Sequence, residues 1–198
     1  MNIINRAKQK EKILINRPPH VSSIVFVKTK GSWAPEDAVK YFGFHNFQRV
    51  ELLDRIIDRV WFYDDSEWFH ILEGWYYPLY NQGNFPLYDQ SDFVNTLLKL
   101  SSEYDVFWFS VGDADCSFNY SYYSGGECKR KFVVKSPRYD DRVIEINEGK
   151  KLPYEDNILN DNDEIIFSDN ECVTVLLKLA ESLGIKTKYD ESNFQGYK

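Results

Sequence analysis

The stretch CSFNYSYYSGGECKRKFVVK, residues 116–135, decides what kind of fold this chain can adopt. Apolar or aromatic residues alternate with polar ones on both sides of two glycines, as in half-buried strands joined by a tight turn. The apolar set comprises Cys116, Phe118, Tyr120 and Tyr122 before the glycines and Cys128, Phe132 and Val134 after them. We therefore predict an antiparallel β-hairpin here.

The position of the turn decides which side chains of this hairpin share a face. A two-residue turn at 125–126 places Phe118 opposite Val133 and sets aromatic rings against lysines. A three-residue loop at 124–126 instead places Phe118 opposite Phe132. A shift of one residue moves every side chain to the other face, so we predict the three-residue loop, which keeps the apolar residues together.

Further strands follow from composition and periodicity. Residues 21–27 are short and β-branched, and residues 142–147 alternate in the manner of a strand. Between residues 59 and 72, two aromatic runs flank the polar Asp64-Asp65-Ser66, which predicts a second hairpin. Residues 106–109 are apolar throughout, so we expect that strand to be central and buried on both faces.

Helix signals occur in three places. Pro35 and the acids after it suit the first turn of a helix that Gly43 can end. A second helix, capped by Asp89 or Ser91, carries apolar residues at helical spacing up to residue 100. The capping box 168–171 opens a C-terminal amphipathic helix with Gly184 at its end.

These elements predict an α+β fold in which an antiparallel sheet built from hairpins has helices packed on one face. The length of 198 residues fits a single domain, residues 1–198. We expect residues 1–18 to be a loosely attached basic segment and residues 189–198 to be a frayed tail.

Aromatic residues make up 17 % of the chain, with 14 Tyr, 14 Phe and 5 Trp. One explanation is a thin core filled with large rings. The other is a binding surface, because exposed Tyr and Trp offer large contact areas at low entropic cost. On the second interpretation, we predict that Trp68, Trp75, Tyr120 and Tyr122 contact a partner.

Charge is distributed unevenly around a net charge of −7. Residues 140–198 hold fourteen acidic and seven basic side chains, which would repel nucleic acid and steer a cationic protein towards the molecule. Ordinary solubility charge is the alternative. Residues 1–30 are basic but too short and too poor in aromatics for a nucleic-acid site.

The sequence contains no signal peptide and no apolar run of the roughly 18 residues that a membrane span requires. Its three cysteines, an odd number, do not form a disulfide framework. In the predicted register Cys116 and Cys128 are too far apart to be bonded. We therefore expect a cytoplasmic protein that binds neither membranes nor nucleic acids.

No phosphate-binding, zinc or EF-hand motif is present, so we expect no cofactor and no metal. An enzyme acting on a sugar or nucleotide stays open as an alternative. Asp113 and Asp115 form a DxD pattern, which is used for divalent metals with nucleotide sugars but is also common in turns. A second carboxylate group, of the kind used for acid/base chemistry on carbohydrates, comprises Asp64, Asp65, Glu67 and Glu73.

Arg130 is the residue we single out, because the predicted register places it opposite Tyr120 on the aromatic face. A guanidinium there must be paired with a carboxylate, stacked on rings or directed into a pocket. We expect a structural role with a buried carboxylate partner. The alternative is a binding site lined by Arg130 with Asp113 and Asp115.

One resemblance bears on function. Residues 111–126, with GDAD and YSYYSGG, Arg130, and EGKKLPYE at 148–155 resemble small bacterial immunity proteins, the cytosolic antidotes of polymorphic or contact-delivered toxins. The similarity spans about residues 105–185. It implies a non-enzymatic protein that binds a toxin domain, frequently through an acidic surface, and it assigns no functional residue by position.

Three functions are therefore open. We expect a non-enzymatic protein-binding protein, an immunity protein that neutralises a cognate cationic toxin. The alternatives are an enzyme that uses one of the carboxylate groups, and a structural or regulatory subunit whose aromatic patch pairs with itself.

Overall fold

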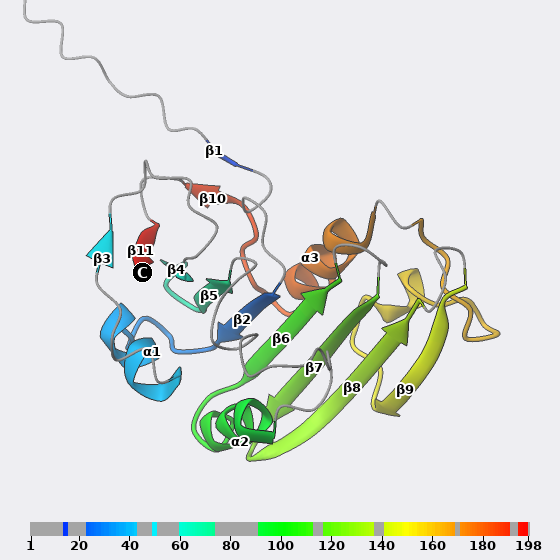
Figure 1. Cartoon of the computed structure of the whole chain (residues 1–198), viewed down its shortest axis with the longest axis horizontal. Coiled ribbons are helices and arrows are strands. Elements are labelled where there is room, and N and C mark those ends of the chain that lie inside the picture. Colours follow the sequence, from blue (N-terminus) through cyan, green and yellow to red (C-terminus); the bar gives the residue numbers. More distant parts are fainter. Residues whose placement is uncertain are drawn as a thin grey trace, which may run out of the picture.

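The computed structural model describes residues 14–15, 23–42, 49–50, 60–73, 91–112, 117–136, 141–168, 171–190 and 194–197. Its strands are β1 (Leu14–Ile15), β2 (Ser23–Val27), β3 (Arg49–Val50), β4 (Val60–Asp64), β5 (Phe69–Glu73), β6 (Val106–Val111), β7 (Phe118–Ser124), β8 (Glu127–Lys135), β9 (Val143–Gly149), β10 (Tyr189–Asp190) and β11 (Gln195–Tyr197). Its helices are α1 (Pro35–Phe42), α2 (Ser91–Leu100) and α3 (Cys172–Ser182), with a 3₁₀ turn, η1, at Glu155–Asn157 (Figure 1).

Nine strands form one sheet in the order β3-β11-β4-β5-β2-β6-β7-β8-β9, and every neighbouring pair is antiparallel. The hairpins β4–β5 and β7–β8 lie on either side of β2 and β6. Strands β1 and β10 pair separately. The predicted α+β class, the antiparallel sheet and the C-terminal helix are confirmed.

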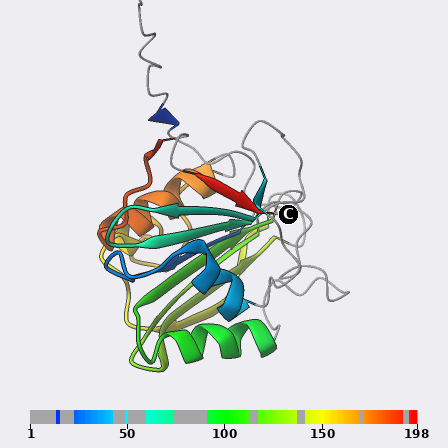
Figure 2. The same cartoon turned by 90° about the vertical axis from the view of Figure 1, so that its left-hand side faces the viewer.

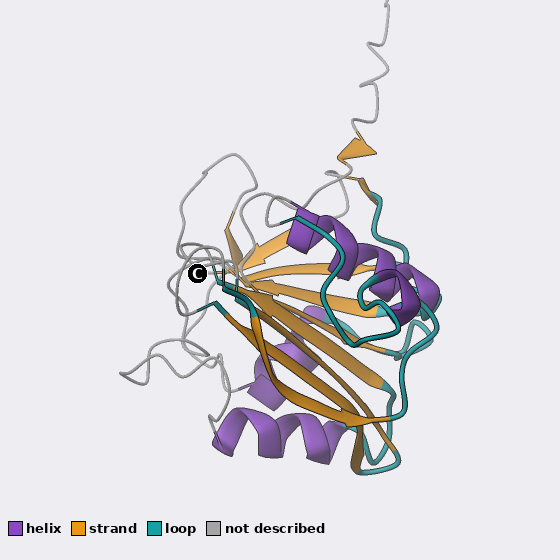
Figure 3. Ribbon diagram, turned by 90° about the vertical axis from the view of Figure 1, so that its right-hand side faces the viewer, coloured by secondary structure: helices purple, strands orange, loops and turns teal. Residues whose placement is uncertain are grey.

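Helices cover both faces of this sheet, whereas we predicted them on one face. Strand β6 gives the reason, because Phe107 and Phe109 pack in the core that includes α3. Val106 and Trp108 point the other way and pack with residues of α1 and α2. A sheet whose central strands are apolar on both faces needs a covering layer on each side. Figures 2 and 3 show α1 and α2 on one side and α3 on the other.

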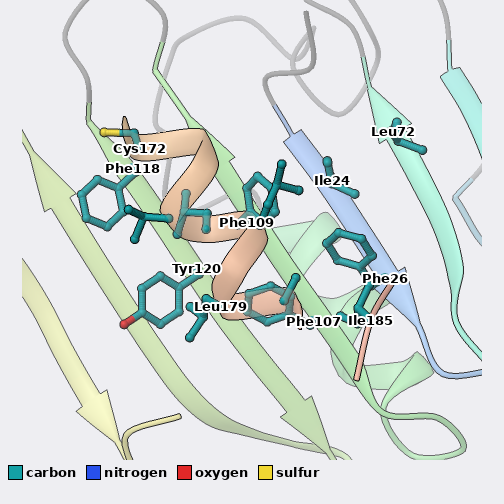
Figure 4. Close-up of a cluster of buried hydrophobic side chains, with 14 of the residues drawn as sticks. Ile24, Phe26, Leu72, Phe107, Phe109, Phe118, Tyr120, Cys172, Leu179 and Ile185 are labelled. Atoms are coloured by element: carbon teal, nitrogen blue, oxygen red, sulfur yellow. The ribbon is translucent and has the colours of Figure 1, made fainter. Parts of the chain in front are cut away.

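The aromatic residues fill these cores. Figure 4 shows the side under α3, where rings of neighbouring strands gather around Leu179. The centroids of Phe26 and Phe107 are 5.9 Å apart, and those of Tyr120 and Phe132 are 5.1 Å apart. Every described aromatic side chain is buried or half-buried. For this part of the chain the thin-core explanation is correct, and the predicted surface rings are wrong.

The β7–β8 hairpin has the predicted apolar face except for Cys128, which pairs with Tyr123 and not with Tyr122, and the other partners also differ from the prediction. Gly125 and Gly126 have φ values of +62° and +77°, as in a two-residue type I′ turn, so the three-residue loop is wrong. Beyond the turn, a bulge leaves Lys129 without a partner on β7. The pairs that follow are Tyr122 with Arg130, Tyr120 with Phe132 and Phe118 with Val134. The extra residue returns Arg130, Phe132 and Val134 to the face of Phe118, Tyr120 and Tyr122.

The C-terminal helix ends as predicted, but the predicted capping box is only half formed, because α3 begins at Cys172 and its N-cap is Glu171, without a side-chain cap hydrogen bond. The Glu171 carboxylate accepts hydrogen bonds from the backbone N–H and the hydroxyl of Ser168, at 2.9 and 2.6 Å. Gly184 follows the helix with φ +85°. The frayed tail is wrong where the structure describes it, because Tyr189 and Phe194 are buried and both β10 and β11 pair with other strands.

Two further expectations concern the described residues. Cys128 and Cys172 are free thiols, whereas Cys116 lies outside the described residues. No helix in the described part of the chain is long and apolar enough to cross a membrane.

Candidate functional site

Arg130 of β8 is buried, with 1 % of its surface exposed, and forms an ion pair with Glu155 of η1. Nε donates to Oε1 at 2.8 Å and Nη2 to Oε2 at 2.6 Å, which is the strong bidentate arrangement. The guanidinium also lies 5.3 Å from the Phe132 ring centroid. Burial alone would lower the pKa of Arg130, but the hydrogen bonds to Glu155 raise it above its ordinary value. The predicted buried carboxylate partner is confirmed.

This ion pair fastens the turn of residues 148–155, the EGKKLPYE stretch, to β8. Arg130 Nη1 donates to the carbonyl of Glu148 at 2.9 Å, and Glu155 Oε1 accepts from the backbone N–H of Leu152 at 2.9 Å. Gly149 pairs with Arg130 and has φ +85°. These contacts hold the chain after β9 against β8.

Three of the seven predicted binding residues, Trp68, Tyr120 and Arg130, are too buried to contact a partner. Trp68 is 2 % exposed, and Tyr120 is fully buried among the rings of the α3 core. Arg130 is paired with Glu155, which agrees with the expected structural role and not with the alternative of a ligand contact. Tyr122 is half-buried. The remaining predicted binding residues, Trp75, Asp113 and Asp115, lie outside the described residues.

A second buried polar group joins the C-terminal segment to the β4–β5 hairpin. His70 Nε2 lies 3.4 Å from Asp65 Oδ2, and its Nδ1 lies 3.4 Å from the Tyr189 hydroxyl. Asp65 Oδ2 also accepts from the backbone N–H of Lys186 at 3.0 Å. A carboxylate, a histidine and a hydroxyl that lie in a row in space could serve catalysis, but all three residues are buried from solvent. We therefore assign this group to structure.

The two other carboxylates of the hairpin whose side chains the structure describes, Asp64 and Glu67, have separate partners and do not form an acid/base pair with each other. Asp64 Oδ1 accepts from the backbone N–H of Ser66 at 2.8 Å, which shapes the turn. Glu67 lies 3.6 Å from Lys28 in a surface ion pair. The side chain of Glu73, the last member predicted, lies outside the described residues.

The buried His70 predicts that acid destabilises the fold. Burial lowers its pKa below the ordinary 6.5, although Asp65 partly opposes this, so the folded protein holds the ring neutral. Unfolding lets the ring take up a proton, so the free energy of unfolding should fall below about pH 6.5, by up to about 1.4 kcal/mol per pH unit. Urea unfolding between about pH 7.5 and about pH 5 measures this slope.

His70→Gln is the control for that prediction, because the other histidines, His20 and His45, remain in both proteins. The variant should lose about one proton of the pH dependence over this range. Hydrogen bonds outweigh burial and keep the pKa of Asp65 below its ordinary 3.8, so Asp65 adds its own loss of stability only below about pH 4. An identical slope in wild type and His70→Gln would refute the assignment.

The most exposed apolar side chains of the described residues, together with six exposed acids, lie on β9 and on the chain that follows it. Val143 and Ile166, each 53 % exposed, are the large hydrophobic residues most open to solvent in the described part. Arg142 Nη1 donates to the carbonyl of Phe167 at 2.8 Å, so the neighbours of these two residues are in contact. The exposed acids of the same segments are Glu145, Glu148, Asp156, Asp161, Asp163 and Glu164. We call Val143, Ile166 and these six acids the acidic edge.

Our sequence predictions included the acids of the acidic edge only as part of the acidic residues 140–198, and they named neither Val143 nor Ile166. A signal existed for Val143, which precedes the half-buried Ile144 in β9 and so points away from the core that Ile144 packs against. Ile166 carries no such signal, because it lies in an irregular segment whose path depends on tertiary contacts.

No protein-family model matches the chain, and neither a curated protein nor a solved structure gives a match.

Proposed function

We propose that this chain is a non-enzymatic protein-binding protein whose acidic edge receives a cationic partner, and that it acts as an immunity protein for a toxin. The observation that carries the proposal is the composition of the acidic edge. Its exposed apolar side chains, Val143 and Ile166, lie on segments rich in exposed acids. An apolar centre with a charged rim is the usual composition of a protein-binding surface.

The charge balance of this region supports a cationic partner. Residues 141–171 contain ten acidic and three basic side chains, and one acid, Glu155, is neutralised by Arg130 from outside the segment. Such a surface raises the association rate of a positively charged protein and disfavours a negatively charged one. The toxin assignment rests on the resemblance of residues 105–185 to immunity proteins.

Reversing two of these acids should abolish most of the steering. In Asp156→Lys/Asp161→Lys, we expect the association rate with the partner to fall by about tenfold or more at low salt. The partner is first captured from the native organism with wild-type protein and identified by mass spectrometry. Rates are then measured by surface plasmon resonance at low and physiological salt, because charges beyond about 8 Å are screened at 0.15 M.

The matched control is Glu36→Lys/Glu103→Lys, which changes the net charge equally at exposed positions on α1 and after α2. It should alter the rate by about twofold or less. If both variants lost the same fraction of the association rate, the acids of the acidic edge would contribute only to solubility and not to partner binding. Expression of the captured partner should arrest growth, and co-expression of this protein should restore it; a harmless partner would contradict the immunity role.

A further inference from the structure

β9 is the last strand of the described sheet. Its inner side pairs with β8 from Lys135 opposite Val143 to Arg130 opposite Gly149. No described strand pairs with its outer side, and Figure 1 shows β9 as the last strand of the sheet. Alternate residues of such a strand direct their N–H and C=O groups away from the sheet, where another extended chain can bind them.

The same edge is held rigidly. Arg130 binds the Glu148 carbonyl at one end of β9 and also pairs with Glu155 in the turn beyond. Near the other end, Lys135 of β8 forms an ion pair with Glu145. A strand fixed in its extended form loses little further entropy when a second chain pairs with it, which favours binding.

Charge decides what kind of chain can pair there. A second copy of β9 would bring Glu145 and Glu148 towards acids of the same kind, and like charges across strands are destabilising. The register also shifts between Val133 and Val134, which leaves Glu145 as an extra residue on β9. Bulges and charges of this type protect an edge from self-pairing. A partner segment that carries Lys or Arg would instead be attracted to Glu145 and Glu148.

We propose that the outer edge of β9 binds an extended, basic segment of the partner as an added antiparallel or parallel strand. The basic side chains of the added strand face Glu145 and Glu148, and its apolar side chains contact Val143 and Ile166. This inference rests on the proposed protein-binding function and specifies how the acidic edge achieves it.

The test uses a fluorescein-labelled peptide of alternating lysine and valine, about eight residues long, as the probe. Two counterparts have the same sequence, and each carries N-methyl groups on one of the two alternate sets of backbone amides. Their charge is unchanged, but in each of them one edge of the peptide can no longer donate hydrogen bonds. Fluorescence anisotropy should show that methylation on one of the two edges of the peptide weakens binding by about tenfold or more. Equal affinity for the unmodified peptide and both methylated forms would overturn the proposal.

Hydrogen exchange locates the binding. The unmodified peptide should slow exchange of alternate amides of β9 and leave β4, β5 and their hairpin unchanged. Protection elsewhere, or none in β9, would overturn the proposal.

Proline substitutions then test the edge from the side of the protein. Of Asn147 and Glu148, which are adjacent, one directs its N–H towards β8 and the other outwards. Asn147→Pro and Glu148→Pro should therefore differ, and the variant that keeps the wild-type urea midpoint should bind the peptide about tenfold more weakly. Undiminished binding by that variant would count against the added strand.

These outcomes separate the inference from the function it rests on. If charge reversal at Asp156 and Asp161 abolishes capture of the native partner while the methylated peptides bind normally, the partner binds through side chains. The proposed function then stands and strand addition fails. If charge reversal has no effect on capture, the proposed function itself fails.

Discussion

Arg130→Ala should lower the free energy of unfolding by about 3–5 kcal/mol, the cost of leaving one member of a buried ion pair without its partner. The substitution strands the fully buried Glu155 carboxylate and frees the Glu148 carbonyl. Urea unfolding at pH 7 measures the change. The turn of residues 148–155 should also exchange its amides faster, because Arg130 is what fastens it to β8.

Two further variants separate the buried pair from charge in general. Arg130→Met/Glu155→Leu removes both charges together and should recover most of the lost stability, since no charge is left buried alone. Lys135→Ala breaks the exposed pair with Glu145, whose side chains are 47 % and 40 % exposed, and should cost at most about 1 kcal/mol. Equal losses in Arg130→Ala and Lys135→Ala would contradict the structural role of Arg130.

Gly149→Ala should lower the free energy of unfolding by roughly 2–6 kcal/mol, an effect comparable to that of Arg130→Ala, for two reasons that add. The backbone of Gly149 has φ +85°, which strains any residue with a Cβ. A Cβ at this position would also lie 2.1 Å from the carbonyl oxygen of Lys129. Backbone atoms of a paired strand cannot move aside, so β8 and β9 would have to separate.

Gly184→Ala is the matched control for that substitution. Gly184 has the same φ of +85°, but no atom lies within 4 Å of the position its Cβ would occupy. The expected loss is the conformational cost alone, about 1–2 kcal/mol by urea unfolding. If Gly149→Ala were no more destabilising than Gly184→Ala, the close approach of β8 to β9 would be wrong.

The β7–β8 hairpin shows which structural features the local sequence can predict and which it cannot. Alternation from Phe118 to Val134 identified the strands and the side chains that share a face, because that depends only on the period of two. The partners could not be predicted, because the two-residue turn and the bulge at Lys129 together produce the same faces as a different loop. A pattern with period two cannot distinguish registers that differ by two residues.

The candidate site divides in a similar way. The sequence predicted that Arg130 needs a buried carboxylate, since an unpaired guanidinium among aromatic rings is too costly. It could not name Glu155, because 25 positions separate the two residues and only the path of the turn after β9 brings them together. Trp68 and Tyr120 were predicted at a surface, since aromatic composition does not distinguish a binding face from a thin core covered on both sides.

The sequence by itself determined the longer strands, the three helices and the antiparallel α+β class, because each depends on neighbours within a few residues of one another. It did not predict the short strands β1, β3, β10 and β11, which pair with segments distant in sequence. Only the tertiary structure decided the order of the strands, the covering of both faces by helices, and the pairing of Arg130 with Glu155. It also decided that Val143 and Ile166 are left exposed beside acids at the edge of the sheet. These features depend on which distant segments exclude water from one another, and local periodicity carries no information about that choice.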